Sequence, residues 1–150
     1  NGIVAAALYW FPALCGETPL AYLYAVATAP AFRGRGLCHK LMEDTHSHLA
    51  GLGYGGTVLV PGSKALFAFY EEMGYHAFGS IREFDCPAGA KGIPLRKLSL
   101  EEYTLLRRRK LPKGGILQEG ETLAFLQTQA DFYAGEGLIF AAFFSFSFLS

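Results

Sequence analysis

The hydrophobic pattern of the chain changes period between residues 28 and 37, and no other feature constrains the fold as much. Two continuous apolar runs, residues 3–14 and 20–28, are separated by the turn-forming residues 15–19. A short polar turn between two such runs is typical of an antiparallel pair of strands. From Leu37 onward, apolar residues recur every three or four positions, which is the pattern of one helix face. The sequence therefore predicts a strand pair followed by a helix.

Alternation of strands and helices continues as far as residue 84. Residues 57–60 (TVLV) are predicted to form a short buried strand, and Ser63 is expected to cap a second helix. Residues 75–84 return to strand-like spacing. The order β–β–α–β–α–β predicts an α/β (α+β) fold with a mixed sheet flanked by helices. The core-facing residues of the second helix are predicted to be Leu66, Phe69 and Met73.

A second region begins after a stretch rich in proline and glycine, residues 86–94. Ser99 and Glu102 have the spacing of a capping box, in which each side chain accepts a hydrogen bond from the other residue's amide. The helix that this box opens ends in the basic residues 107–110. Positive charge suits the last turn of a helix because it complements the helix dipole, so this run needs no nucleic-acid partner to explain it.

The remaining segments complete the predicted domain organisation. A weaker helix is expected over residues 121–129, and the apolar segment 137–149, with its Phe-Ser alternation, resembles a half-buried strand. We therefore predict a core domain over residues 1–88, a linker over 89–94 and a second unit over 95–150.

The composition excludes several classes of protein. The 13 basic and 13 acidic residues cancel, so binding of nucleic acid through bulk charge is not expected. A chain with 51% hydrophobic residues is not intrinsically disordered. The uncharged C-terminal segment is shorter than the roughly 20 apolar residues of a membrane span, so no membrane association is expected. The three cysteines, an odd number without metal-ligand spacing, predict reduced thiols, a cytoplasmic protein and no bound metal.

Residues 25–38 (AVATAPAFRGRGLC) carry the strongest indication of function, because a strand ends there and a helix begins. Free amides at a helix N-terminus bind anions, and Gly34 and Gly36 let the backbone approach a ligand closely. Arg33 and Arg35 add charged donors for phosphate. The segment predicts a cradle for a phosphate or pyrophosphate, with a simple tight turn as the alternative. It has neither the Gly-Lys-Ser/Thr ending of a P-loop nor the Rossmann glycine pattern.

Two ordered motifs resemble the GNAT acetyltransferase superfamily. The segment Arg33-Gly34-Arg35-Gly36-Leu37-Cys38 resembles the signature Arg/Gln-x-x-Gly-x-Gly/Ala, after a strand that reads A-V-A-T-x-P. Residues 69–75 (FYEEMGY) resemble the family's F-Y-E-K-x-G-F segment, and the resemblance covers about residues 2–85. Cys38 departs from the Gly or Ala of the signature but is small enough for that position.

The resemblance implies a mostly antiparallel mixed sheet and an N-acetyltransferase that uses acetyl-CoA. The amides of residues 33–38 would hold the pyrophosphate, and the strand 26–28 would bond the pantetheine while residues 57–60 splay away. Tyr70 would protonate the departing thiolate after direct attack by a primary amine, of a small molecule or a peptide, in a ternary complex. The implied cofactor-binding residues are Val26, Ala27, Thr28, Arg33, Gly34, Arg35, Gly36, Leu37 and Cys38.

Other candidate residues have plainer interpretations. Tyr70 has packing in the core as its alternative role, and Cys38 has either a lowered thiol pKa beside the phosphate amides or simple packing. Glu17, in the hairpin turn, lies either near the acceptor amine or in solvent. No general base is identified. The histidines are interpreted as surface residues that form no ligand set: His39, His46, His48 and His76.

The resemblance also sets expectations about completeness. A GNAT domain begins with a strand and two helices before the position that matches Asn1, so we expect an N-terminally incomplete domain whose activity alone is in doubt. Residues 95–150 resemble the start of a second GNAT-like half, as in bacterial two-domain members, with a structural or substrate-shaping role. The rival functions are a non-catalytic acyl-CoA-binding or sensing module and a nucleic-acid contact through the Arg-Gly loop. The sequence identifies neither the amine nor the oligomeric state.

Overall fold

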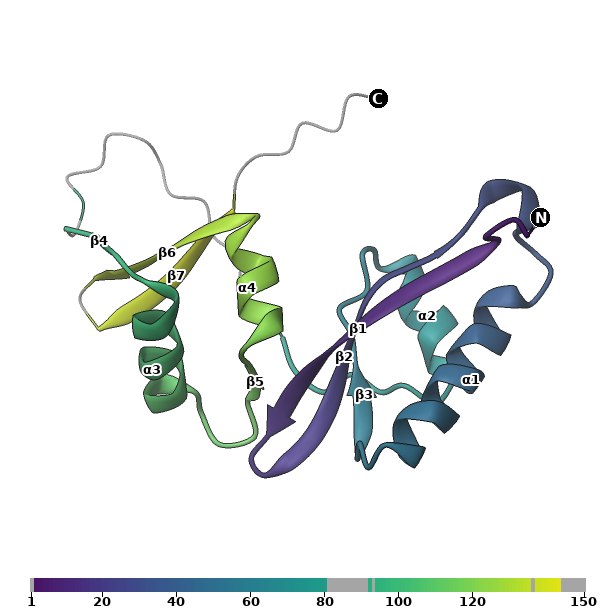
Figure 1. Cartoon of the computed structure of the whole chain (residues 1–150), viewed down its shortest axis with the longest axis horizontal. Coiled ribbons are helices and arrows are strands. Elements are labelled where there is room, and N and C mark those ends of the chain that lie inside the picture. Colours follow the sequence, from purple (N-terminus) through teal and green to yellow (C-terminus); the bar gives the residue numbers. More distant parts are fainter. Residues whose placement is uncertain (1, 81–91, 93, 136, 144–150) are drawn as a thin grey trace.

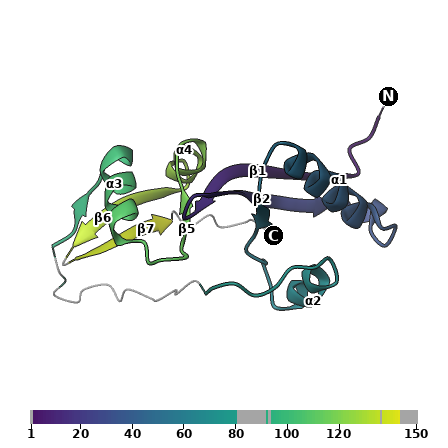
Figure 2. The same ribbon diagram turned by 90° about the horizontal axis from the view of Figure 1, so that it is seen from below.

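The computed structural model describes residues 2–80, 92, 94–135 and 137–143 of the chain. Its elements form two groups that lie end to end, as two views at right angles show (Figure 1, Figure 2). The first group consists of residues up to 80, and the second of most residues from 94 to 143. The predicted mixed, mostly antiparallel α/β fold is confirmed.

The first group is built around the predicted hairpin. Strand β1 (Ala6–Cys15) pairs antiparallel with β2 (Thr18–Thr28), from Ala6 opposite Thr28 to Cys15 opposite Thr18. Gly16, with a φ of +60°, forms the tight turn in the left-handed conformation that glycine adopts at little cost. Successive side chains of a strand point to opposite faces of the sheet, so Ala21 and Leu23 of β2 are buried together on one face.

A third strand completes one edge of this sheet. Strand β3 (Gly56–Val58) runs parallel to β2, with Leu20 opposite Gly56 and Tyr22 opposite Val58. The other edge is occupied by β5 (Ile116–Gln118), which pairs antiparallel with the end of β1. The strand order is β3-β2-β1-β5, so one strand of the second region belongs to the first sheet.

Two helices complete the first group. Helix α1 (Leu37–Gly51) begins where the period change predicts it and buries Met42 and Leu49. Helix α2 (Ala65–Glu71) contributes Tyr70, which is 8% exposed, to the same core. The core cluster therefore joins one face of the sheet to both helices, through Ala21, Leu23, Met42, Leu49 and Tyr70.

The region around α2 differs from the prediction in three ways. Ser63 does not cap the helix: Lys64 is the residue before it, and no side chain bonds its first amides. Leu66 is 37% exposed, because the buried stripe of this short helix centres on Tyr70 instead. Residues 75–80 form no strand, and residues 81–84 of the predicted strand lie outside the described residues.

The second group has a sheet and a core of its own. Strands β4 (Arg96–Lys97), β6 (Ala130–Gly135) and β7 (Leu138–Phe143) form an antiparallel sheet in the order β4-β6-β7. Helices α3 (Leu100–Lys110) and α4 (Glu121–Gln127) contribute to its core, in which the Tyr103 and Phe132 rings stack with centroids 4.0 Å apart. The predicted linker falls mostly outside the described residues, as do residues 144–149 of the predicted final strand.

The predicted capping box at the start of α3 is confirmed. The Glu102 amide donates to Ser99 Oγ at 3.2 Å, and the Ser99 amide donates to Glu102 Oε2 at 2.9 Å. Two of the free amides at this helix end are thereby satisfied.

The two groups meet along the edge of β1. Phe125 of α4 stacks on Phe11 with ring centroids 5.2 Å apart and meets Tyr24 edge-on at 5.1 Å. Thr122, 2% exposed, donates its hydroxyl to the Pro12 carbonyl at 3.0 Å. Proline suits this position because it has no amide for an outer strand to pair with. Aromatic packing, a strand pairing and a buried hydrogen bond together hold the second group against the first.

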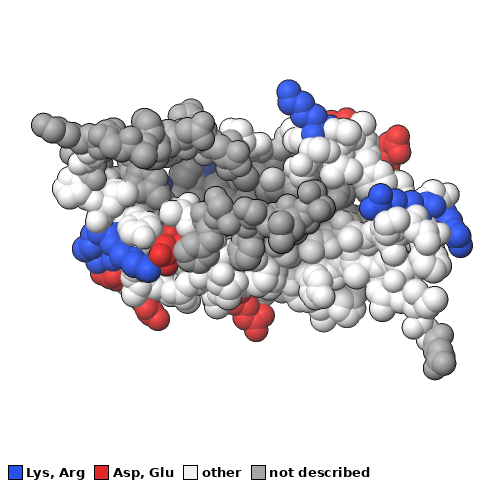
Figure 3. Space-filling view, turned by 90° about the horizontal axis from the view of Figure 1, so that it is seen from above, with Lys and Arg blue, Asp and Glu red and all other residues white. Residues whose placement is uncertain are grey.

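The described surface limits other interpretations. On the face in Figure 3, lysines and arginines form separate groups at the left end, the upper edge and the right end, with acidic side chains near them, so its described part carries no continuous basic stripe. Among the described residues, no helix has both the length and the apolar character that a membrane crossing requires. Within the same residues, no cluster of three or more His, Cys, Asp or Glu side chains has the arrangement of a metal site.

Candidate functional site

The most distinctive backbone feature is the divergence of β2 and β3. Their pairing ends at Tyr22 and Val58, after which the chain leaves the sheet while β2 continues to Thr28. No described strand pairs with that edge of β2 over residues 23–28. An unpaired strand edge presents a row of amides and carbonyls that an extended ligand can bond as an added strand would.

A bulge distorts β2 along this open edge. Tyr9 lies opposite Tyr24 but Ala7 lies opposite Ala27, so β2 has one extra residue there. Ala25 has a φ of +51°, the one positive value recorded for a non-glycine residue in the described chain. Bulges re-aim the backbone, and residues held in this strained region cluster at functional sites. The bulge therefore marks the open edge as the place to look for a ligand.

The open edge of β2 leads directly to the N-terminus of α1. Gly36 precedes the helix in the left-handed conformation, with a φ of +71°, and no side chain caps the first amides. Gly34 also has a positive φ, of +72°, and a side chain on either glycine would meet no atom within 4 Å. Open space beside these two glycines therefore lies next to helix amides that no side chain caps, at the positive end of the helix dipole.

Both arginines of the loop brace the loop itself. Arg33 Nε donates to the Thr28 carbonyl at 3.2 Å, and an Arg35 terminal nitrogen donates to the Ala31 carbonyl at 3.0 Å. The Arg35 guanidinium also lies 5.2 Å from the centre of the Phe32 ring. Each guanidinium has five N–H donors, so the bracing leaves donors for an anion beside the helix end.

Cys38 lies near two other side chains named by the sequence, Thr28 and Tyr70. The Thr28 hydroxyl is buried and forms no hydrogen bond of good geometry with a described residue, and the Cys38 thiol lies beside it. Burial raises the pKa of the Cys38 thiol, so a thiol with a lowered pKa at this helix end, one of the two readings of the sequence, is not found. Burial, with Cys38 close by, also raises the pKa of the Tyr70 hydroxyl. Tyr70 is therefore protonated at neutral pH and can act as a proton donor.

A polar cluster that the sequence analysis missed lies next to Tyr70. His46 Nε2 is 2.8 Å from the Tyr75 hydroxyl, which is 2.6 Å from Thr57 Oγ1. His46 and Thr57 are themselves 3.3 Å apart. Burial lowers the pKa of His46 and raises the pKa of Tyr75, so the cluster is neutral near pH 7.

His46 is therefore not the surface residue that was predicted. It lies four residues after Met42 and three before Leu49, on the buried face of α1. That spacing is the signal by which the sequence identifies it. His39 is also half-buried, edge-on against Phe69 at 5.0 Å between ring centroids, whereas His48 and His76 are exposed as predicted.

A groove of about 1610 Å³ is lined by Tyr70 and the His46 cluster, whereas residues 23–38, which include the open edge of β2 and the start of α1, do not line it. It runs past the point where β2 and β3 diverge, and Tyr22, Val58, Tyr70 and Tyr75 line it. Residues from the end of α3 through β5 form another part of its lining. Glu17 is exposed in the hairpin turn and does not line the groove.

Residues 15–78 match a family profile described as "Acetyltransferase (GNAT) domain". This segment of the chain is therefore similar to a GNAT acetyltransferase domain. The matched segment includes β2, the glycine-rich loop, α1, the divergent β3 and α2, which are the elements that form the open edge and the helix end. No curated protein sequence matches the chain.

Solved structures extend the likeness beyond this GNAT segment. The crystal structure of a GCN5-related N-acetyltransferase from Kribbella flavida aligns with 94% of this chain at 17% identity, with a TM-score of 0.58. A glucosamine-6-phosphate N-acetyltransferase from Arabidopsis thaliana aligns with 55% of it at 22% identity, with a TM-score of 0.47. The chain spans 40% of the length of the first and 56% of the second. At these identities the Kribbella likeness describes the fold alone.

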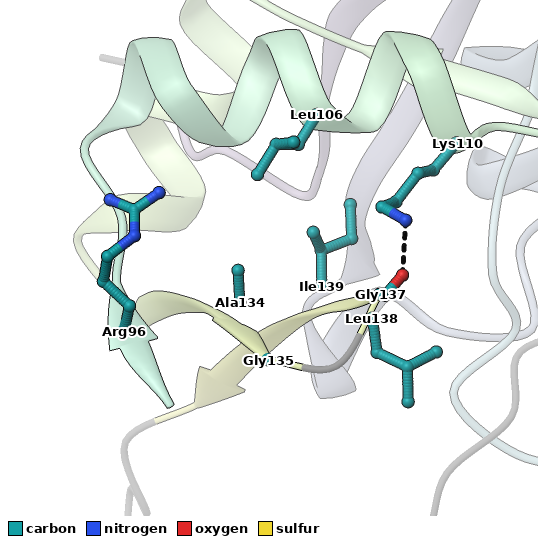
Figure 4. A pocket seen from close by; sticks show the side chains of 8 residues that line it. All are labelled: Arg96, Leu106, Lys110, Ala134, Gly135, Gly137, Leu138 and Ile139. Atoms are coloured by element: carbon teal, nitrogen blue, oxygen red, sulfur yellow. Dashed lines mark hydrogen bonds between the residues drawn. The ribbon is translucent and has the colours of Figure 1, made fainter. Parts of the chain in front are cut away.

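A smaller cavity lies in the second group, away from the GNAT motifs. Its volume is about 310 Å³, and Figure 4 shows it between α3 and the ends of β6 and β7. Lys110 donates from its amine to the Gly137 carbonyl, and Arg96 forms an ion pair with Glu102 at 2.6 Å. Both cations at its rim already have partners and the floor is apolar, so this cavity has no evident chemistry.

Proposed function

We propose that this chain binds acetyl-CoA along the open edge of β2 and transfers the acetyl group to a primary amine by direct attack in a ternary complex. The observation that carries the proposal is the divergence of β2 and β3 after Tyr22 and Val58, which leaves an open strand edge leading to an uncapped helix end. The GNAT match over residues 15–78 supports acyl transfer as the reaction class.

The helix end is the proposed site for the pyrophosphate. The backbone amides of residues 33–38 would bond its oxygens, with the helix dipole and the remaining N–H groups of Arg33 and Arg35 adding positive charge. The open space at Gly34 and Gly36 supports this role, because a phosphate can approach the backbone there.

The pantetheine is proposed to lie along Val26, Ala27 and Thr28, bonding the backbone as an added strand. The bulge at Ala25 supports this placement, since it re-aims the adjacent amides relative to a regular strand. One of these amides would then stabilise the oxyanion that forms when the amine attacks the acetyl carbonyl.

Tyr70 is the proposed general acid. The amine nitrogen forms a bond to the acetyl carbon, the C–S bond breaks, and the thiolate takes the Tyr70 proton; the proton lost by the amine passes to solvent and the phenol is reprotonated. The raised pKa of Tyr70 and its position on the groove beside Cys38 support this assignment. No covalent intermediate on the enzyme is needed.

We further propose that residues 1–88 form the donor-binding domain and residues 95–150 the start of a second GNAT-like half. The separate core clusters of the two groups support this division. The odd number of cysteines supports a cytoplasmic location.

The proposal is tested by thermal unfolding with acetyl-CoA and with adenosine. Acetyl-CoA at about 100 times its dissociation constant should add roughly 2.7 kcal/mol of stability, and adenosine should add little because it lacks the pyrophosphate. Gly36→Val should abolish the acetyl-CoA shift. Gly16→Val is the matched control, because it places the same strained side chain at a similar φ in the hairpin turn. Equal shifts from the two compounds would contradict the cradle.

Turnover separates the enzyme from a non-catalytic acyl-CoA-binding or sensing module. Both would be stabilised by acetyl-CoA, but the enzyme alone releases free thiol when a primary amine is added. Stabilisation without amine-dependent thiol release would favour the sensing module.

A further inference from the structure

The part of the groove that the second group lines carries positive charge. Arg107 of α3 and Lys113 of the following loop are among the lining residues, as are Thr18 and Leu20 of β2. Glu71 is the one carboxylate among the described residues of this lining. The groove is therefore suited to a ligand with negative charge at this end.

Arg107 differs from its basic neighbours in how it is bonded. Arg108 is paired with the Glu119 carboxylate, and Lys110 donates to the Gly137 carbonyl. Arg107 forms no ion pair with a carboxylate among the described residues, although its side chain is half-buried. A half-buried guanidinium without a counter-charge is costly, so a ligand that brings one is favoured.

The Arg107 guanidinium is also held in place. Its terminal nitrogens donate to the Tyr103 hydroxyl at 3.4 Å and to the Ile116 carbonyl at 3.2 Å. Tyr103 is buried and stacked on Phe132, so its hydroxyl is a fixed anchor. Nε is buried without a partner among the described residues, and each terminal nitrogen retains one N–H. A preorganised guanidinium with free donors is well suited to a carboxylate or phosphate.

The pairing of strands gives the distance from Arg107 to the reacting end. Ile116 pairs with Cys15, Cys15 pairs with Thr18, and the divergence begins four residues further along β2 at Tyr22. Four residues of strand span about 13 Å along the sheet, and β5 lies two strand spacings of about 4.8 Å each from β2, so the two points are about 16 Å apart. An acceptor held at Arg107 must therefore be extended, with its amine about that distance from its charged group.

We propose that the acceptor is an extended amine that carries an anionic group, a carboxylate or a phosphate, bound by Arg107 with Lys113 nearby. This proposal rests on the proposed acyl transfer, since it assigns the acceptor class of the same groove. It gives the second group a direct role in substrate selection.

The test measures peptide binding to the full chain saturated with coenzyme A. The probes are pentaglycine and its C-terminal amide, and the amidated peptides Gly-Gly-Gly-Gly-phosphoserine and Gly-Gly-Gly-Gly-Ser, because a pentapeptide matches the span of about 16 Å. An anionic member should bind roughly tenfold more tightly than its neutral counterpart. A preference within the first pair identifies a carboxylate, and one within the second pair a phosphate.

Arg107→Gln should abolish this preference, and Arg109→Gln should preserve it, because Arg109 is exposed on the same helix and does not line the groove. Should R107Q fail to fold, Arg107→Lys keeps the charge but loses the planar fork, and the preference should then fall several-fold. Equal binding of anionic and neutral peptides would overturn the proposal, and so would no binding of any peptide. An undiminished preference in R107Q, or in R107K where R107Q does not fold, would overturn it as well.

The acetyl-CoA measurements keep the two proposals apart. Stabilisation by acetyl-CoA and amine-dependent thiol release, with no preference for anionic peptides, would reject the acceptor class alone. Loss of acetyl-CoA stabilisation, with the peptide preference retained, would reject acyl transfer and leave an anion site at Arg107.

Discussion

The hydroxyl of Tyr70 lies where the hydrophobic core meets the groove. Its ring packs edge-on against Phe69 and Tyr75, at centroid distances of 5.3 and 5.6 Å, so the core fixes its orientation. The hydroxyl makes no hydrogen bond with another described residue, and burial raises its pKa. A phenol held in this way is positioned by packing while its proton remains available to a ligand in the groove.

Replacing Tyr70 by Phe should lower turnover roughly 10²–10⁴-fold while leaving folding and acetyl-CoA affinity nearly unchanged, because only the hydroxyl is lost. The measurement is the steady-state rate per folded molecule, with thermal unfolding as the check on folding. Tyr75→Phe is the control: it removes hydrogen bonds to His46 and Thr57, so it should lower stability but not turnover per folded molecule. A Y70F variant that loses stability and keeps its rate would make Tyr70 a core residue.

At the scale of elements, the hairpin, α1 and the capping box of α3 could be predicted because their signals are local. The two apolar runs of residues 3–28, the change of period at Leu37 and the spacing of Ser99 and Glu102 each lie within one segment. The cluster around His46 could not be assembled in the same way. It joins α1 to β3 and to Tyr75 beyond α2, and a single side chain's surroundings depend on how those elements pack.

The His46 cluster predicts how stability depends on pH. Burial lowers the pKa of His46, so the unfolded chain takes up a proton near pH 6.5 while the folded chain does so at lower pH. The contribution of His46 is therefore fully present above pH 6.5 and is lost as the pH falls below it, with a slope of at most about 1.4 kcal/mol per pH unit. Denaturant unfolding at pH 7.5 and 5.5 measures this loss.

His46→Gln should flatten the pH dependence, whereas His48→Gln, at an exposed position of the same helix, should leave it as in the parent protein. Other groups that titrate in this range affect all three proteins alike. An equal loss of stability in the parent and H46Q proteins would show that His46 is not the group responsible.

At the scale of the whole molecule, the groove is shaped by both groups. The two predicted units are recognisable in the separate cores, but the sequence could not show that β5 leaves the second unit to pair with β1. A strand of three residues has almost no sequence signature, and its partner lies about a hundred residues away along the chain. The same pairing brings Arg107 to the groove, through the Ile116 carbonyl.

Removing the hydrogen bond between Thr122 and Pro12 tests how the second group is held against the first. Thr122→Val keeps the shape of the side chain but removes the hydroxyl that donates to the Pro12 carbonyl at 3.0 Å. Because Thr122 is 2% exposed, water cannot replace the lost bond, and the free energy of unfolding should fall by about 1–3 kcal/mol. Thr128→Val is the matched control, since that hydroxyl bonds the nearby Phe125 carbonyl on the exposed end of α4. Denaturant unfolding measures the free energy of unfolding of both variants. Amide hydrogen exchange in β5 should become faster in T122V alone, because β5 pairs with β1 where the two groups meet. Equal stability of T122V and the parent protein, with β5 exchange unchanged, would show that the aromatic stack of Phe11 and Phe125 holds the groups together without this bond.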